Sequence, residues 1–250
     1  MGNFLARNKP PRYLLREYIL KCILKSYKPG KFLEIGYGAG DMLITLVKAG
    51  YHGCAYDSSI YAKNVASKTL KGDGVTEVEL IDSFPEDEHF DYIFFFELFG
   101  YFKEPIVYLV NLKRNLSRGS HLIFSFTNSR HGGIAEKKTG GMSCFSRKEV
   151  EVILEKSGYT IVEIINYGYP LSNIIRPLLH FYFKFKTPEN SIKEVEKSGL
   201  SHQRTIFRVL GVLVNKYTLL PFLYCQVFFK KTDLGTGYIV VAKKRVENEW

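Results

Sequence analysis

The sequence contains few cysteines, and none of them is paired at metal-binding or disulfide spacing. Its four cysteines, Cys22, Cys54, Cys144 and Cys225, lie far apart and form no C-x-x-C pair. A zinc site needs closely spaced ligands, and a disulfide framework needs more cysteines in a shorter chain. We therefore expect free thiols in a reducing compartment, the cytoplasm.

Long apolar runs are also missing. The chain starts with Met1 to Arg7 and continues with charged residues, not with the apolar region of a secretory signal. Ala6 stands where a myristoylation signal has Ser or Thr. The longest uncharged run, Tyr217 to Phe229, contains Pro221 and is shorter than the ~20 residues that span a bilayer. We expect no cleaved secretory signal and no transmembrane helix.

Acidic residues are scarce in two segments. Residues 1–31 carry eight Lys and Arg against Glu17 alone, and residues 170–231 carry ten against three acids. The net charge of +10 is therefore concentrated there. A basic protein suggests a nucleic-acid partner, but no DNA- or RNA-binding signature is present, and both segments are rich in aromatic residues. The two alternatives are a solvated basic face and a surface that contacts an anionic membrane.

The rest of the chain alternates strands with helices around what can be one core, since 46% of its 250 residues are hydrophobic. Alternation of this kind predicts parallel βαβ units in a doubly wound α/β sheet. Ser146 with Glu149 predicts a capping box at the start of a late helix. We expect strands at 31–35, 53–57, 77–82, 91–96, 121–127, 160–166 and 237–243, and helices at 12–27, 41–49, 58–70, 105–116 and 147–157.

Three glycines alternate after the first expected strand, in Glu34-Ile-Gly-Tyr-Gly-Ala-Gly40. Glycine permits positive φ and lets a ligand approach the backbone closely, and the helix that follows offers free N–H groups to an anion. A dinucleotide fingerprint would read G-x-G-x-x-G, which this spacing is not. Asp57 ends the second strand, where it can accept two ribose hydroxyls. The alternative role for this aspartate is a helix N-cap.

With the segments after it, this loop resembles the class I S-adenosylmethionine-dependent methyltransferases of the ubiquinone-biosynthesis type. The resemblance covers residues 30–165. It implies a Rossmann-like seven-stranded doubly wound sheet with a helical insertion between strands six and seven. The matching segments are 32–41 (cofactor loop), Asp57 (ribose), Asp82-Ser83 (adenine), 90–97 (fourth strand), 112–119 (passage to the fifth strand) and 144–146 (entry to the late helix).

From the length of the chain and the order of its segments we expect one methyltransferase domain over residues 1–250. Within it, residues 1–29 form a basic amphipathic helix region, and residues 30–169 with 232–250 form the cofactor-binding core. Residues 170–231 form a helical cap. This cap either only covers the active site or also contacts membrane or lipid. The sequence contains no heptad repeat and does not predict an oligomeric state.

The resemblance also assigns roles in binding S-adenosylmethionine. Glu34 and Gly36 orient the methionine part, Asp57 holds the ribose, and Asp82 bonds the adenine amino group. Many relatives carry E-x-x-E-H after the fourth strand, whereas residues 97–101 have Gly and Tyr in the last two places, so we expect no metal. The expected cofactor-binding residues are Glu34, Gly36, Tyr37, Gly38, Gly40, Asp57, Ser58, Ile60, Asp82, Ser83 and Glu97.

Methyl transfer from a sulfonium is an in-line displacement, which positioning and exclusion of water can largely catalyse. A general base is needed only when the acceptor must lose a proton. The candidates are Tyr101 and His131, whose alternative roles are packing and a surface loop. We expect a small, apolar or amphiphilic acceptor. The alternatives are a non-catalytic cofactor-binding or membrane-associated scaffold, and an RNA or protein methyltransferase. The absence of an N/D-P-P-Y tetrad at residues 96–99 argues against a nucleic-acid enzyme that methylates an amino nitrogen.

Overall fold

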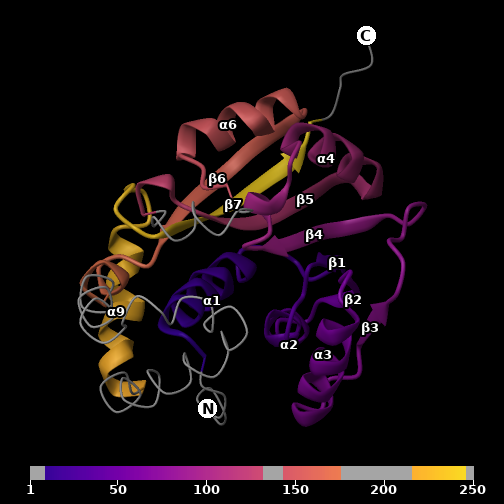
Figure 1. Cartoon of the computed structure of the whole chain (residues 1–250), viewed down its shortest axis with the longest axis horizontal. Coiled ribbons are helices and arrows are strands. Elements are labelled where there is room, and N and C mark those ends of the chain that lie inside the picture. The colour runs from indigo at the N-terminus through magenta and orange to yellow at the C-terminus, as the bar shows by residue number, and fades with distance from the viewer. Residues whose placement is uncertain (1–8, 132–142, 176–215, 246–250) are drawn as a thin grey trace, which may run out of the picture. The chain divides into compact units, whose positions relative to one another are not determined.

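The computed structural model describes residues 9–131, 143–175 and 216–245. These residues contain a seven-stranded sheet in the order β3-β2-β1-β4-β5-β7-β6 (Figure 1). β1 to β5 pair in parallel, and β7 runs antiparallel to β5. The seven-stranded α/β sheet is therefore confirmed. The strands are β1 Lys31–Ile35, β2 His52–Tyr56, β3 Val78–Ile81, β4 Phe90–Phe96, β5 Leu116–Thr127, β6 Tyr159–Tyr167 and β7 Gly237–Lys244.

Helices cover both faces of this sheet: α2 and α3 lie on one face, and α4 and α6 lie on the other (Figure 1). On the second side, leucines and a valine of α4 and α6 join the apolar side chains of the central strands in one core. The helices are α1 Pro11–Leu24, α2 Asp41–Lys48, α3 Ile60–Gly72, α4 Pro105–Leu112, α6 Arg147–Lys156 and α9 Lys216–Phe228, with 3-10 turns η1 Phe99–Tyr101, η2 Lys113–Asn115 and η3 Ser129–His131.

The chain divides into two compact units. Residues 20–165 and 237–250 form the core unit, and residues 1–19 and 166–236 form the insertion unit. In the insertion unit, residues 171–175 and α9 are helical. Residues 176–215, which belong to the expected helical insertion, lie outside the described residues.

β4 forms the centre of the core unit because it is apolar almost throughout. Six of its seven residues are buried, with Asp91 as the exception. Such a run is typical of a parallel strand covered by helices on both faces. On the α4 and α6 side, Phe95 stacks on Phe124 of β5 with ring centroids 4.7 Å apart. This packing holds the carboxyl ends of β4 and β5 next to each other.

The passage from α4 to β5 differs from the prediction. The helix expected over 105–116 ends at Leu112 and a 3-10 turn follows. The amide of Asn115 is buried and donates to the carbonyl oxygens of Pro85, Glu86 and Glu88 at 2.7, 3.1 and 3.0 Å. These bonds hold the chain in the turn, and β5 begins at the next residue. Gly119, which lies between the helix expected at 105–116 and the strand expected at 121–127, is inside β5 with φ +79°.

The start of α6 agrees with the prediction. Ser146 Oγ accepts a hydrogen bond from the Glu149 N–H at 3.3 Å, and the Glu149 carboxylate accepts one from the Ser146 N–H at 2.7 Å. Both halves of a capping box are therefore present. Hydrogen bonds from the Ser146 backbone and hydroxyl lower the pKa of Glu149.

Two glycines mark the place where the chain enters and leaves the insertion unit. A Cβ at Gly168 would collide with Thr236 Oγ1, and a Cβ at Gly235 would collide with Asn166 Oδ1 and the Tyr167 carbonyl. The Asn166 N–H donates to the Lys230 carbonyl at 2.8 Å. The segment that follows β6 and the segment that precedes β7 are therefore in contact within this unit.

Candidate functional site

The glycine-rich turn connects β1 to α2 and places all three glycines in the left-handed region. Gly36, Gly38 and Gly40 have φ of 71°, 54° and 78°. A Cβ at Gly36 would lie 3.1 Å from Leu98 Cδ2, and a Cβ at Gly40 would lie 3.0 Å from Ala66 Cβ. A Cβ at Gly38 would meet nothing within 4 Å. Packing therefore surrounds Gly36 and Gly40, whereas Gly38 faces open space that a ligand can enter.

Asp57 follows β2 directly and lies against this turn. Its Oδ2 accepts a hydrogen bond from the Gly38 N–H at 3.0 Å, and its Oδ1 accepts one from the Ser59 N–H at 2.9 Å. The N-cap of α3 is Ser59, whose Oγ accepts from the Ala62 N–H at 3.3 Å. The N-cap alternative for Asp57 therefore does not apply. Its carboxylate is fixed by backbone N–H groups at the carboxyl end of the sheet.

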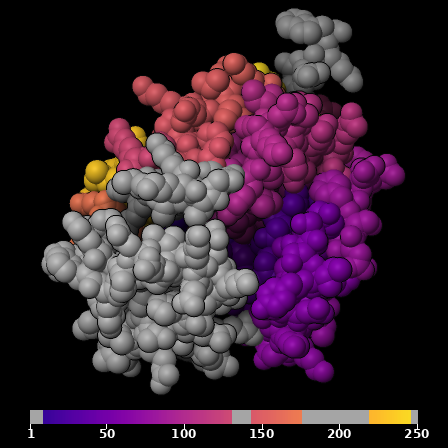
Figure 2. Space-filling view, viewed as in Figure 1, coloured from indigo at the N-terminus to yellow at the C-terminus, as the bar shows by residue number. Residues whose placement is uncertain are grey.

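The next strand end adds a second carboxylate. Asp82 follows β3 and forms an ion pair with Lys63 of α3. Ile60, the first residue of α3, is 81% exposed, and Ser58 and Ser83 are exposed too. α3 contributes to the surface of the core unit in Figure 2. Asp82 therefore lies against α3, whose first residue is apolar and exposed.

Lys63 was missed by sequence reasoning. It lies three residues after Ile60, and this spacing places the two residues on neighbouring positions of one helix face. That spacing is a local signal, but the ion pair with Asp82 depends on how α3 packs beside β3, which spacing alone does not define.

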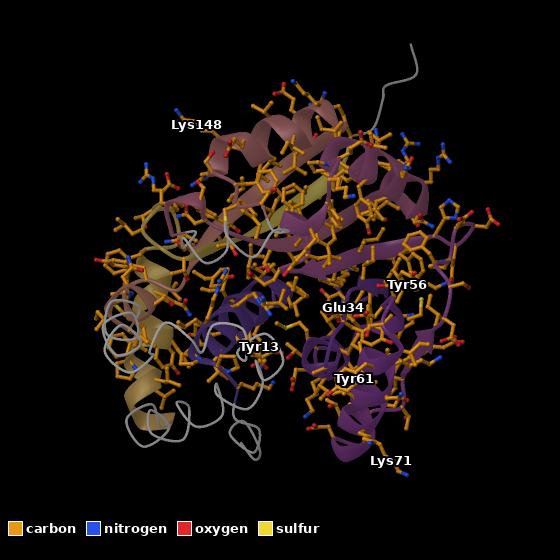
Figure 3. The ribbon with its side chains drawn as sticks, viewed as in Figure 1. Tyr13, Glu34, Tyr56, Tyr61, Lys71 and Lys148 are labelled. Atoms are coloured by element: carbon orange, nitrogen blue, oxygen red, sulfur yellow. The ribbon has the colours of Figure 1, made fainter. Side chains whose placement is uncertain are left out.

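Two buried polar residues flank the start of the turn. Glu34 is 2% exposed on β1, next to β2, which ends in Tyr56 (Figure 3). Tyr37 is 5% exposed, and among the described residues its hydroxyl has no hydrogen-bond partner. Burial, with the negative charges of Asp57 and Asp82, raises the pKa of Tyr37. The phenol therefore stays protonated and can donate a hydrogen bond to a ligand in the turn.

Glu97 follows β4 in an unusual backbone conformation. Its φ of 58° is the only positive one among the described residues other than glycine, and such a residue costs roughly 1–2 kcal/mol in the left-handed region. Its two carboxylate oxygens accept hydrogen bonds from Ser125 Oγ at 3.0 Å and Thr127 Oγ1 at 3.2 Å. Its N–H donates to Ser125 Oγ at 3.0 Å. The surrounding structure therefore holds this carboxylate in place despite the strain.

Ser125 and Thr127 were also missed by sequence reasoning. They alternate with phenylalanines on β5, so both side chains point to one face of the sheet. Polar residues at every second position of an otherwise apolar strand are a usable signal. Their partner is a residue about thirty positions earlier, which only the pairing of β4 with β5 identifies.

The two candidate bases are placed differently. Tyr101 ends η1 after β4, and its side chain is 58% exposed. A packing role is therefore not observed for Tyr101. His131 ends η3 after β5, and its side chain lies outside the described part of the chain. Within the described ranges, no group of three or more His, Cys, Asp and Glu side chains is placed to hold a metal ion.

Residues 6–164 match a family model described as a methyltransferase domain. The chain belongs to this methyltransferase family. It is an S-adenosylmethionine-dependent methyltransferase of class I, with S-adenosylmethionine as its cofactor. The ubiquinone-biosynthesis subtype stays a prediction. No curated protein sequence matches the methyltransferase significantly.

Solved structures share the fold. A S-adenosylmethionine-dependent methyltransferase from Aquifex aeolicus has 23% identity and a TM-score of 0.54, over 64% of this chain and 88% of that one. A putative methyltransferase from Bacillus halodurans C-125 has 12% identity and a TM-score of 0.59, over 92% and 100%. The cyclase SpnF has 16% identity and a TM-score of 0.58, over 92% and 81%.

The residues of the turn fit this cofactor. Gly38 is open to a ligand, the N-terminus of α2 at Gly40 has no side-chain cap, and the buried Tyr37 hydroxyl has no partner among the described residues. The N-terminus of a helix favours a carboxylate, and the fixed carboxylate of Asp57 can accept hydroxyl hydrogen bonds.

Proposed function

We propose that this methyltransferase acts on a small, apolar or amphiphilic acceptor by direct in-line transfer. The observation that carries the proposal is Glu97. A strained, partly exposed carboxylate is held at the end of β4, next to β1, where the strand order reverses. In open α/β sheets, ligands bind at the carboxyl ends of the strands at such a point. Strain that neighbouring hydroxyls maintain is typical of functional positions.

The cofactor-binding residues expected from the sequence support this proposal. Asp57 has lone pairs beyond those used by Gly38 and Ser59, and they can accept ribose hydroxyls. Asp82 would accept a hydrogen bond from the adenine amino group, and Ile60 would lie against the adenine. Glu34 on β1 and Glu97 after β4 would hold the methionine end. The bound cofactor supplies a methyl group on a sulfonium, and the protein positions the acceptor and excludes water.

A general base is needed only when the acceptor must lose a proton. Tyr101 follows Glu97 by four residues and exposes its phenol, so this side chain can reach a ligand near the end of β4. His131 follows β5 at the same edge of the sheet. The Leu, Val, Phe and Tyr residues of 170–231 support an apolar or amphiphilic acceptor.

The test has two steps. Titration calorimetry with S-adenosylhomocysteine is expected to show micromolar binding by the native protein. Tritium transfer from methyl-labelled S-adenosylmethionine is then measured with pooled amphiphilic acceptors, with an oligonucleotide and with a denatured protein mixture. Label entering only the small-molecule pool supports the proposal, and label entering only RNA or protein overturns it.

A second candidate function keeps the cofactor but not the transfer. The relatives' E-x-x-E-H pair is absent here, and a cyclase shares this fold. Under this alternative, S-adenosylhomocysteine binds with the same affinity and no labelled product forms from any pool.

A further inference from the structure

α9 carries no charged residue after its first position, Lys216. The next charged residue along the chain is Lys230. One face of the helix is buried: Leu219 is 4% exposed and Leu223 5%, and both pack against leucines of α1 and Leu171. A surface helix normally places polar residues on the opposite face.

The opposite face of α9 is apolar instead. Tyr224 is 59% exposed and Phe228 is 86% exposed, and their four-residue spacing places them on one helix face. The next residue, Phe229, packs against Tyr169 with ring centroids 4.7 Å apart. Phe228 is therefore an aromatic side chain directed to solvent beside one that is packed.

Two aliphatic residues of the same unit are exposed as well. Ile174 is 52% exposed and Leu234 is 42% exposed. The Asn173 amide donates to the Leu234 carbonyl at 2.9 Å, so the two aliphatic residues belong to segments in contact. We call Tyr224, Phe228, Ile174 and Leu234 the apolar patch.

Positive charge accompanies the patch. Residues 1–19 and 166–236 carry fourteen Lys and Arg against five Asp and Glu, so +9 of the net charge of +10 belongs to the insertion unit. Lys230 and Lys231 follow Phe228 almost directly, and Lys231 is exposed. Aromatic and aliphatic side chains next to lysines are typical of helices that lie in a membrane interface. None of the described helices is long and apolar enough to cross a bilayer.

We infer that the apolar patch docks the protein on the surface of an anionic lipid bilayer, with α9 lying in the plane of the interface. Tyr224 and Phe228 enter the boundary between head groups and acyl chains, and Lys231 contacts the anionic head groups. The charge of the insertion unit favours this occupant over a second copy of the chain, which carries the same charge and repels it. Single-stranded nucleic acid can stack on the rings of Tyr224 and Phe228, but Ile174 and Leu234 offer it no stacking surface.

Vesicle flotation tests the inference. The full chain is mixed with phosphatidylcholine vesicles with and without phosphatidylserine, at low salt. We expect flotation only with phosphatidylserine, and weaker binding as salt is raised. Tyr224→Ser with Phe228→Ser should reduce the partition coefficient roughly tenfold or more. Lys231→Glu reverses one charge and should reduce it roughly tenfold to thirtyfold.

The matched control replaces two exposed apolar residues of the core unit, Val107 and Val152, which are 52% and 47% exposed. Val107→Ser with Val152→Ser should float as the native protein does. Phe228→Trp, in a chain with Trp250→Phe, adds a direct readout: its emission should shift to the blue and be quenched by brominated lipid.

Three outcomes overturn the inference. One is equal flotation of the native protein and the Tyr224→Ser, Phe228→Ser variant. Another is no flotation while light scattering shows self-association that this variant loses. The third is no flotation while an oligonucleotide binds. Because none of these measurements uses the methyl acceptor, they stand apart from the test of the proposed function.

Discussion

The Asp57 carboxylate accepts a hydrogen bond from the backbone N–H of Gly38, 3.0 Å away, and so connects the end of β2 to the glycine-rich turn after β1. A residue predicted to bind the ribose therefore also supports the loop predicted to hold the methionine part. Substitutions at Asp57 should affect both.

Asp57→Ala should weaken S-adenosylhomocysteine binding about tenfold to a hundredfold, because hydrogen bonds to a charged group contribute roughly 1.5–3 kcal/mol. Calorimetry measures the change. Asp91→Ala is the matched control, since Asp91 Oδ2 also accepts from one backbone N–H, that of Lys31 at 2.9 Å, at the other end of β4. Equal losses in the two variants would contradict a ligand-binding role for Asp57.

Gly38→Ala and Gly40→Ala should separate binding from folding. Both add a Cβ at positive φ, at a cost of roughly 1–2 kcal/mol. Gly40→Ala also presses on Ala66, so urea denaturation should show the larger loss of stability there. The new methyl group at position 38 enters open space and should mainly weaken cofactor binding. A Gly38→Ala protein with native affinity would count against a cofactor at this turn.

Glu97→Gln keeps the shape of the side chain and removes its charge. One of the two hydroxyls of Ser125 and Thr127 can still donate to the amide oxygen, and the other can rotate its O–H and accept from the amide NH2. Both contacts are then kept in neutral form, so the melting temperature should fall only modestly. Cofactor affinity or methyl transfer should fall by about tenfold or more if the carboxylate faces the ligand. Ser125→Ala is the comparison, because it keeps the negative charge of Glu97 and removes one of the hydrogen bonds that hold the Glu97 carboxylate in place. Native binding and turnover in Glu97→Gln would leave the strained backbone without a functional role.

His121 should make folding stability depend on pH. Burial, and then the positive charge of Lys243, lower its pKa from 6.5 to about 4. The folded protein therefore favours the neutral imidazole. This contribution is complete above pH 6.5 and is lost as pH falls through 6.5 toward 4, by at most about 3 kcal/mol. Urea denaturation at several pH values should show a shallower slope in His121→Phe. An unchanged slope would contradict this assignment.

The core unit was largely predictable from the sequence. Glycines, strand-end acids and the capping box at Ser146 are local signals, and each appears within a residue or two of its expected place. The predicted end of α4 was wrong because the buried amide of Asn115 donates to carbonyl groups about thirty residues earlier. This tertiary contact outweighs helix propensity.

The candidate site was predictable only in part, for the same reason. Asp57 and Asp82 directly follow β2 and β3, so their place in the site could be predicted from their sequence position alone. Lys63 and Ser125 take their roles from partners on other elements. Positive φ at Glu97 carries no sequence signal, since glycine or asparagine is the residue expected there.

Gly168 and Gly235 lie at the two ends of the long segment between β6 and β7. Because its two ends meet at these glycines, the length of the segment can change without moving either strand. Its content is constrained by α1, since Leu219 and Leu223 pack against Leu14 and Leu15. An exchange of the segment between family members, cut at Gly168 and Gly235, should therefore preserve the fold of the recipient only when residues 14 and 15 are exchanged with it.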